Sequence, residues 1–234
     1  MNILNSTFLV TGGSAGIGKA TAKLFVEKGG KVAITGRDKT KLEKVAKEVG
    51  AFPIPADVAV ESDVFKTYKL FLKQFGKLDC LINNAGIGDA SNEITQLDMK
   101  AFHHVYDVNV FGAALMGSEA AKLFKKQNYG NIINIASTAG TKGFANGTVY
   151  ASSKFALRGM TQCWQADLRK YNVRVILVNP SEVTTAFGDK ERNERPEVKN
   201  KLRPLEIAHT IVSALEMDDR GFIPEVTVWA TNPF

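Results

Sequence analysis

The fold is decided by the stretch Thr7-Phe8-Leu9-Val10-Thr11-Gly12-Gly13-Ser14-Ala15-Gly16-Ile17-Gly18, near the start of the chain. Residues 7–10 form an apolar run typical of a buried strand, and apolar residues at helical spacing follow over 19–28. Three glycines at such a junction permit a tight turn, close approach of backbone to a pyrophosphate, and close helix–strand packing. A helix N-terminus adds free N–H groups and partial positive charge. The stretch therefore predicts a dinucleotide-binding turn, although a flexible strand–helix turn can carry the same glycines.

The rest of the chain repeats this alternation of strands and helices. We predict further strands over 31–35, 52–57, 78–84, 131–136, 173–179 and 225–229, and helices over 39–49, 61–75, 95–126 (one or two helices), 150–171 and 205–215. Strands alternating with helices of this length predict a parallel sheet covered on both faces, and the near-continuous apolar strands agree. We therefore predict an α/β protein with a three-layer, doubly wound parallel sheet. No linker divides it, so 1–234 is expected to be a single domain, with a cofactor half over about 1–130 and a catalytic and substrate half over about 131–234.

Composition excludes several classes of protein. The 234 residues are 44% apolar and 23% charged, and no apolar run is long enough to span a membrane. The net charge of +6 suits anionic small molecules, but the lysines are dispersed and no nucleic-acid motif is present. Cys80 and Cys163 lie in apolar segments and are expected to be reduced and buried or nearly so. Together with the absence of an export signal, this predicts a cytoplasmic protein, and the spacing of the three histidines predicts no metal site.

The end of the second predicted strand bears on the choice of dinucleotide. An acid there would accept the ribose hydroxyls of NAD and repel a 2′-phosphate. This chain has Thr35-Gly36-Arg37-Asp38, with Gly36 at the position of the acid and a permanently charged guanidinium next to it. We favour NADP(H) over NAD(H). The alternative is that Arg37 is only a solvated loop residue and that Asp38 takes the role of the acid.

A second chemical signature lies at 137–154. Ser137 follows a predicted strand, and Tyr150 and Lys154 stand four residues apart on a predicted helix. That spacing places the two side chains on one helix face, about 6 Å apart along the axis. A nearby ammonium is expected to lower the pKa of a phenol, which is otherwise near 10, toward the working range of a general acid or base. Taken alone, Tyr-x-x-x-Lys is a common accident of sequence, so its weight depends on the other motifs.

In combination, these motifs resemble the short-chain dehydrogenase/reductase family, and the resemblance extends from Thr7 to about Trp229 in the family's order. It implies a Rossmann fold and an oxidoreductase that moves hydride between NADPH and a ketone or aldehyde, or a secondary alcohol in reverse. By the family's motifs, the implied catalytic residues are Asn109, Ser137, Tyr150 and Lys154. The implied cofactor-binding residues are Gly12, Ser14, Ala15, Gly16, Ile17, Gly18, Arg37, Asp57, Val58, Asn84, Ala85, Gly86, Tyr150, Lys154, Pro180, Val183 and Thr185.

The resemblance also implies a role for each catalytic residue. Tyr150 is expected to be the general acid/base, and Ser137 to position the carbonyl oxygen. Lys154 is expected to lower the tyrosine pKa and hold the ribose hydroxyls of nicotinamide, and Asn109 to hold a water that connects Lys154 to solvent. The family commonly forms homotetramers or homodimers, which we expect here, with a small-molecule carbonyl or alcohol as substrate.

Two departures from the family's pattern leave the subfamily open. Ser181 follows Pro180 where glycine is usual, a disfavoured residue if the turn needs a positive φ. The segment 186–203, which usually covers substrate, is polar and offers few apolar side chains. A 3-oxoacyl-[acyl-carrier-protein] reductase would suit the basic charge, but the last strand lacks the glycines usual in those enzymes. A non-catalytic NADP(H)-sensing regulator is the alternative from another class.

Overall fold

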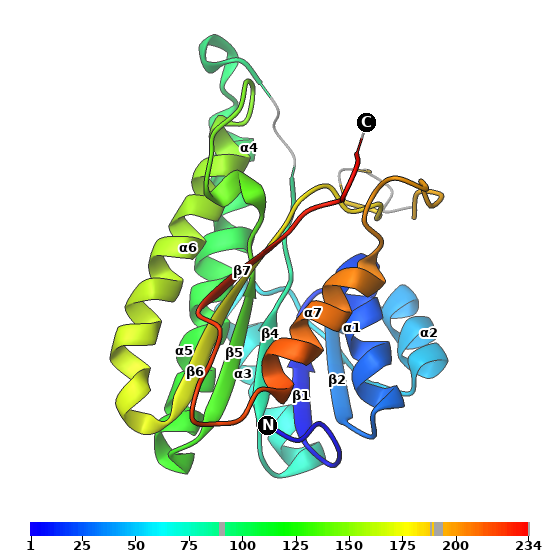
Figure 1. Ribbon diagram of the computed structural model, residues 1–234, viewed down its shortest axis with the longest axis vertical. Helices are drawn as coiled ribbons and strands as arrows, with labels where there is room; N and C mark the ends of the chain where they lie inside the picture. Colours follow the sequence, from blue (N-terminus) through cyan, green and yellow to red (C-terminus); the bar gives the residue numbers. More distant parts are fainter. Residues whose placement is uncertain (89–91, 188, 190–193, 234) are drawn as a thin grey trace.

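Seven parallel strands form one sheet in the part of the chain that the structure describes, in the order β3-β2-β1-β4-β5-β6-β7 (Figure 1). The computed structural model describes residues 1–88, 92–187, 189 and 194–233. The strands are β1 (Thr7–Val10), β2 (Lys31–Gly36), β3 (Phe52–Pro55), β4 (Cys80–Asn83), β5 (Gly130–Ile135), β6 (Val173–Pro180) and β7 (Glu225–Val228). The prediction of a doubly wound parallel sheet in a single domain is confirmed.

Strand register brings the ends of the predicted motifs to one edge of the sheet. Val10 of β1 is paired with Ile34 of β2 on one side and with Ile82 of β4 on the other. Strand order reverses between β1 and β4, and the carboxyl ends at such a point open a crevice in which ligands bind. The glycine turn after β1 and Asn84 after β4 therefore meet at this crevice.

Helices cover both faces of the sheet. They are α1 (Gly16–Glu27), α2 (Lys39–Val49), α3 (Glu61–Phe75), α4 (Met99–Tyr106), α5 (Ala113–Gln127), α6 (Thr148–Leu168) and α7 (Pro204–Glu216). One hydrophobic core joins β1, β2 and β6 to α1, α2 and α7, and Figure 1 shows α7 beside α1. The second core lies on the opposite face, under α3, α5 and α6. Both faces are covered, which explains why the strands are almost continuously apolar.

Helix boundaries follow local capping chemistry. Asp38 begins α2 by accepting a hydrogen bond from the Lys41 amide at 2.9 Å, and Gly50 ends it with φ +78°.

The region predicted as one or two helices over 95–126 is divided further. It contains a short 3₁₀ turn, η1 (Ile94–Gln96), then α4, a π-helical turn η2 (Asp107–Gly112), and α5. The π-helical turn contains Asn109, and such turns often mark functional sites.

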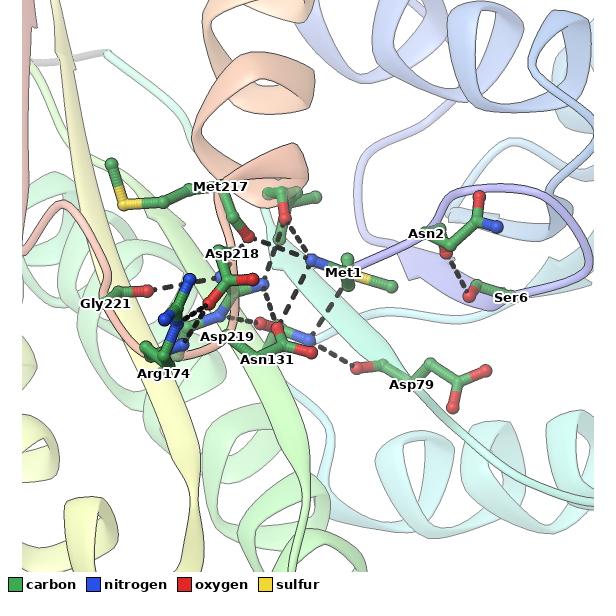
Figure 2. Close-up of polar contacts among 12 residues, drawn as sticks. Met1, Asn2, Ser6, Asp79, Asn131, Arg174, Met217, Asp218, Asp219 and Gly221 are labelled. Carbon is green, nitrogen blue, oxygen red and sulfur yellow. Dashed lines mark hydrogen bonds and ion pairs between the residues drawn. The ribbon is translucent and has the colours of Figure 1, made fainter.

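A buried polar cluster lies at the amino-terminal ends of β5 and β6, opposite the crevice (Figure 2). Arg174 of β6 is 6% exposed, and its Nε donates to Asn131 Oδ1 of β5 at 2.7 Å. Its Nη2 donates to the Leu215 carbonyl near the end of α7 at 3.0 Å, and the Met1 ammonium donates to the same carbonyl at 2.6 Å. A helix leaves its last carbonyls without partners, and cations there are favourable. The cluster therefore ties the end of α7 to β5 and β6.

The structure bears on the predictions about the two cysteines and about membrane spans. Cys80 is buried in β4 as predicted, but Cys163 is exposed on α6, so the prediction that both cysteines lie in or near the core is wrong for Cys163. Cys163 falls on the outward face of the helix, next to the exposed Gln162. Among the described residues, no helix is long and apolar enough to cross a membrane.

Candidate active site

A cavity of about 1080 Å³ lies at the carboxyl ends of the strands. Each strand contributes residues just beyond its end. The cavity wall includes Gly12 after β1, Arg37 after β2, Asp57 after β3, Asn84 after β4, Ser137 after β5, Ser181 after β6 and Trp229 after β7. The predicted site residues all line it except Gly18 and Asn109, which are buried beside it.

The glycine turn is locked to the end of β4. Gly12 has φ +63°, and a Cβ there would lie 2.9 Å from the Ala85 Cα, so both conformation and space require glycine. The Asn84 amide group donates to the carbonyl of Thr11 at 2.9 Å, and the Thr11 hydroxyl accepts from the amides of Asn84 and Ala85 at 2.9 Å. A Cβ on Gly18 would lie 2.5 Å from Asn84 Nδ2. Gly18 therefore shapes the site by permitting this packing without lining it.

The start of α1 fits a phosphate group. The residue preceding the helix, Ala15, has no side chain that could cap it, and the first turn contains no acid. The first N–H groups of a helix have no partner within the helix, and they carry the positive end of its dipole. The glycine turn and this helix start therefore suit the pyrophosphate of a dinucleotide.

The end of β2 offers a small cationic recess. A Cβ on Gly36 would lie 3.2 Å from Ser14 Oγ, so glycine keeps space open next to that hydroxyl. The Arg37 guanidinium, 52% exposed, lies 3.8 Å from an Asp57 carboxylate oxygen. Asp38, the alternative ribose acceptor, uses Oδ1 to cap α2. The recess therefore combines a hydroxyl and a guanidinium, two groups that suit a phosphate.

Ser137, Tyr150 and Lys154 meet at the other end of the cavity. Ser137 precedes the 3₁₀ turn η3 (Thr138–Gly140), and its Oγ accepts from the Ala139 amide at 3.1 Å. Tyr150 lies in the first turn of α6, near enough to Ser137 for that side chain to lower its pKa. Lys154 Nζ lies 5.7 Å from the centroid of the Tyr150 ring and donates to the Ile135 carbonyl at 3.0 Å. The strand end and the helix start thus bring all three side chains together.

Burial dominates the acidity of both groups. It raises the pKa of Tyr150 above its ordinary value, and the Ser137 side chain offsets this only in part. It lowers the pKa of Lys154 to about 8, because the ammonium is removed from water. The net shift of the Tyr150 pKa is therefore upward, and the expected lowering of it by Lys154 stays a prediction. Desolvation of the phenol is the largest cause of this shift.

Asn109 is buried beside the cavity and holds the neighbouring backbone in place. Its side chain accepts from the Ile87 amide and donates to the Ile87 carbonyl, both at 2.9 Å, and donates to Ser153 Oγ at 3.0 Å. A Cβ on Gly86 would lie 3.4 Å from Asn109 Oδ1 and 3.5 Å from Lys154 Nζ. The asparagine thus fixes the chain after β4 against α6, next to the lysine.

Sequence reasoning missed three aromatic side chains that line the same cavity. Phe144, Phe187 and Trp229 line the cavity from the segments after β5, β6 and β7. The Phe187 ring lies 5.5 Å from that of Tyr150, although the surrounding segment was predicted to be polar and poor in apolar contacts. Residues 188 and 190–193 of that segment lie outside the described part of the chain. The sequence did contain a signal for these residues, because each of the three ends or follows a predicted parallel strand.

The turn after β6 accommodates serine without strain. Ser181 does not have a positive φ, and its amide donates to the Val228 carbonyl at 2.8 Å. The departure from glycine at this position therefore has no conformational cost. Among the described residues, no group of three or more His, Cys, Asp or Glu side chains could hold a metal ion.

Comparison with known proteins agrees with this geometry. The family model for short chain dehydrogenase matches residues 6–196. An uncharacterized oxidoreductase of Staphylococcus aureus (strain MRSA252) is 33% identical over 223 residues, covering 94% of this chain and 95% of that protein. The chain therefore belongs to the short-chain dehydrogenase/reductase family and is an oxidoreductase of that family.

Two solved structures show the same architecture. A 3-ketoacyl-(acyl-carrier-protein) reductase from Brucella melitensis, complexed with NADH, is 28% identical with a TM-score of 0.90, covering 99% of this chain and 100% of that one. An alcohol dehydrogenase from Thermococcus sibiricus, complexed with 5-hydroxy-NADP, is 26% identical with a TM-score of 0.89, covering 97% of each chain. These neighbours hold different nicotinamide nucleotides. They support a nicotinamide cofactor for this chain and leave the choice between NAD(H) and NADP(H) to its own residues.

Proposed function

We propose that the protein is an NADPH-dependent carbonyl reductase, which runs in reverse as a secondary-alcohol dehydrogenase. The observation that carries the proposal is a single cavity with a phosphate-binding turn at one end and Ser137, Tyr150 and Lys154 at the other. The dinucleotide has to span such a cavity to bring its reactive ring to the tyrosine.

The preference for NADPH rests on the end of β2. Gly36 removes the carboxylate that would repel a 2′-phosphate, and Ser14 and Arg37 offer a hydroxyl and a guanidinium in its place. Asp38 is the competing acid, but its use as a helix cap draws its carboxylate toward the backbone of α2. The adenine is expected to lie between this recess and Asp57-Val58.

The protein groups supply proton transfer and orientation. When bound, the nicotinamide nucleotide supplies the hydride that adds to the carbonyl carbon, or accepts it in reverse. Tyr150 donates its proton to the carbonyl oxygen, and the Ser137 hydroxyl donates a hydrogen bond to the same oxygen. The raised pKa of Tyr150 keeps the phenol protonated at neutral pH, as a general acid requires. Lys154, while charged, stabilises the phenolate that the transfer leaves.

Asn109 and the residues after β6 have supporting roles in this proposal. The side chain of Asn109 is occupied by Ile87 and Ser153, so a water associated with it would be bound by its main chain or the remaining lone pair. Pro180, Val183 and Thr185 line the wall at which the nicotinamide carboxamide is expected. The division into a cofactor half and a catalytic half near residue 130 is part of the same proposal.

Reduction of 3-oxoacyl thioesters is a second candidate, favoured by the solved 3-ketoacyl reductase with a TM-score of 0.90 and by the net charge of +6. A homotetramer or homodimer in the cytoplasm is the expected context. Phe111 and Phe155, 55% and 44% exposed, are apolar surface that such an assembly would cover.

The test is consumption of NADPH, with NADH in parallel, against a β-ketoacyl thioester, a diketone, an aromatic aldehyde and a bulky cyclic ketone. Wild type should oxidise NADPH with at least one of them, and Tyr150→Phe should not. Turnover confined to the thioester would select the second candidate. Wild-type activity that survives in Tyr150→Phe would refute the assignment of the general acid.

A further inference from the structure

We propose that the catalytic end of the cavity selects carbonyl compounds that carry a flat apolar group, such as an aromatic ring, directly next to the carbonyl. This inference rests on the carbonyl reduction proposed above and names its substrate class. It is carried by three exposed aromatic side chains, Phe144, Phe187 and Trp229, that line the same cavity as Tyr150 and are called the aromatic wall.

The three side chains come from segments far apart in the sequence. Phe144 follows η3, Phe187 follows β6 and Trp229 follows β7, and they are 56%, 38% and 66% exposed. Large exposed apolar side chains are common singly on a surface, but their gathering around a cavity marks a binding site. The same cavity contains Ser137 and Tyr150, and the Phe187 ring contacts that of Tyr150, so we assign the aromatic wall to the part of the substrate next to its carbonyl.

Phe187 is held in place beside the reacting phenol. A Cβ on Gly88 would lie 2.4 Å from its ring, so the ring rests directly on the backbone after β4. The ring is tilted by 57° to that of Tyr150 at a centroid distance of 5.5 Å. The Phe187 amide also donates to Thr185 Oγ1 at 3.1 Å. A ring fixed from two sides narrows the space next to the catalytic hydroxyl and favours a flat group there.

Phe144 is fixed in a similar way. A Cβ on Gly147 would lie 2.7 Å from its ring, so the loop between Ser137 and Tyr150 folds this ring over its own glycine. Trp229 follows β7 directly, and the Ser181–Val228 hydrogen bond of 2.8 Å holds that strand end against β6. Phe144 is therefore held by packing on Gly147, and Trp229 is held by the hydrogen-bonded end of β7. Both present apolar faces.

The chemistry of the wall distinguishes among possible substituents. Aromatic rings prefer offset-stacked or edge-to-face partners, and each pair contributes up to about tenfold in affinity beyond the burial of area. A saturated ring of the same carbon number buries similar area but cannot stack, and a flexible alkyl chain must also lose rotamer freedom. A polar substituent would find no partner on these faces.

The test uses three ketones with equal carbon number: acetophenone, cyclohexyl methyl ketone and 2-octanone. For each, kcat/KM with NADPH is measured for wild type, Phe144→Ala, Trp229→Ala and the control Phe65→Ala. Phe65 of α3 is 48% exposed and does not line the cavity. Comparing each variant with wild type on the same ketone cancels differences in intrinsic reactivity. We expect Phe144→Ala and Trp229→Ala to lower kcat/KM for acetophenone about tenfold and for 2-octanone less than threefold, with Phe65→Ala unchanged.

A conservative variant separates stacking from general packing. Trp229→Phe retains an aromatic face and should restore most of the acetophenone activity, whereas Trp229→Leu should not. Equal losses on all three ketones would overturn the inference while leaving carbonyl reduction intact. A change in mass on sizing, together with such equal losses, would instead assign the aromatic wall to contact with a second copy of the chain. Failure of the wild type to reduce any carbonyl compound, with NADPH bound, would refute the proposed function itself.

Discussion

Replacing Arg37 by alanine tests the preference for NADPH directly. The guanidinium is next to the recess left by Gly36, and its nearest acid, Asp57, lies 3.8 Å away, too far for a tight pair. It is therefore available for a 2′-phosphate with little loss of existing interactions. A hydrogen bond to a charged group contributes about 1.5–3 kcal/mol. Because the Arg37 side chain is 52% exposed, solvent screening favours the lower half of that range.

The expected effect is a loss in NADPH affinity of roughly 10- to 50-fold, corresponding to about 1.5–2.3 kcal/mol. NADH lacks the 2′-phosphate, and its affinity should change less than about twofold. Isothermal titration calorimetry with both nucleotides at one ionic strength measures the two dissociation constants. Arg220→Ala is the matched control, because Arg220 is 92% exposed, lies outside the cavity wall, and its loss makes the same change in net charge.

The changes in NADPH and NADH affinity together decide whether Arg37 recognises the 2′-phosphate. Equal losses for NADPH and NADH in Arg37→Ala would show that the guanidinium acts on a feature common to both, and the argument from β2 would be refuted. Equal NADPH losses in Arg37→Ala and Arg220→Ala would reduce the effect to net charge. A companion change, Gly36→Asp, should also weaken NADPH affinity relative to wild type, because it places a carboxylate beside the phosphate site.

Three further outcomes follow from the geometry. Tyr150→Phe should lower kcat by about 10³-fold, with the NADPH dissociation constant within about twofold of wild type, because only the proton donor is lost; stopped-flow turnover and calorimetry measure the two. Lys154→Met should abolish activity yet raise the free energy of unfolding at pH 7 by about 1–2 kcal/mol, as urea titrations can show. The folded pKa of about 8 lies below the ordinary value of 10.5, so the penalty is present below pH 8 and disappears as pH rises from 8 to 10.5; an advantage that grows with pH would contradict this. Arg174→Met should cost about 2–4 kcal/mol by leaving Asn131 Oδ1 without this donor and the Leu215 carbonyl with only the Met1 ammonium, lowering Tm by about 5–12 °C with NADPH affinity unchanged (Figure 2).

The order of elements and most of the cavity wall could be predicted from the sequence because the signals are local. The glycine turn after β1, the asparagines at the end of β4 and the Tyr–Lys pair on α6 each lie within one strand end or one helix turn. A parallel sheet then gathers strand ends at one edge, so local motifs become neighbours in space. The predicted strands and helices agree with the structure except at their ends and in the region of η2.

The π-helical turn at Asn109 could not be predicted in this way. Its side chain is held by Ile87 and Ser153, which lie on other elements, so the irregular turn depends on tertiary contacts. The exposure of Cys163 similarly depends on which face of α6 packs inward.

The sequence by itself therefore determined the class of fold, the glycine turn after β1 and the candidate catalytic side chains, since each depends on short-range spacing. Only the tertiary structure decided the acidity of those side chains and the character of the substrate end. Burial by distant segments raises the pKa of Tyr150 and lowers that of Lys154, against the effect expected from their spacing alone. Phe144, Phe187 and Trp229 come to line one cavity only because β5, β6 and β7 end side by side. Desolvation and convergence depend on the whole chain, and no local pattern encodes either of them.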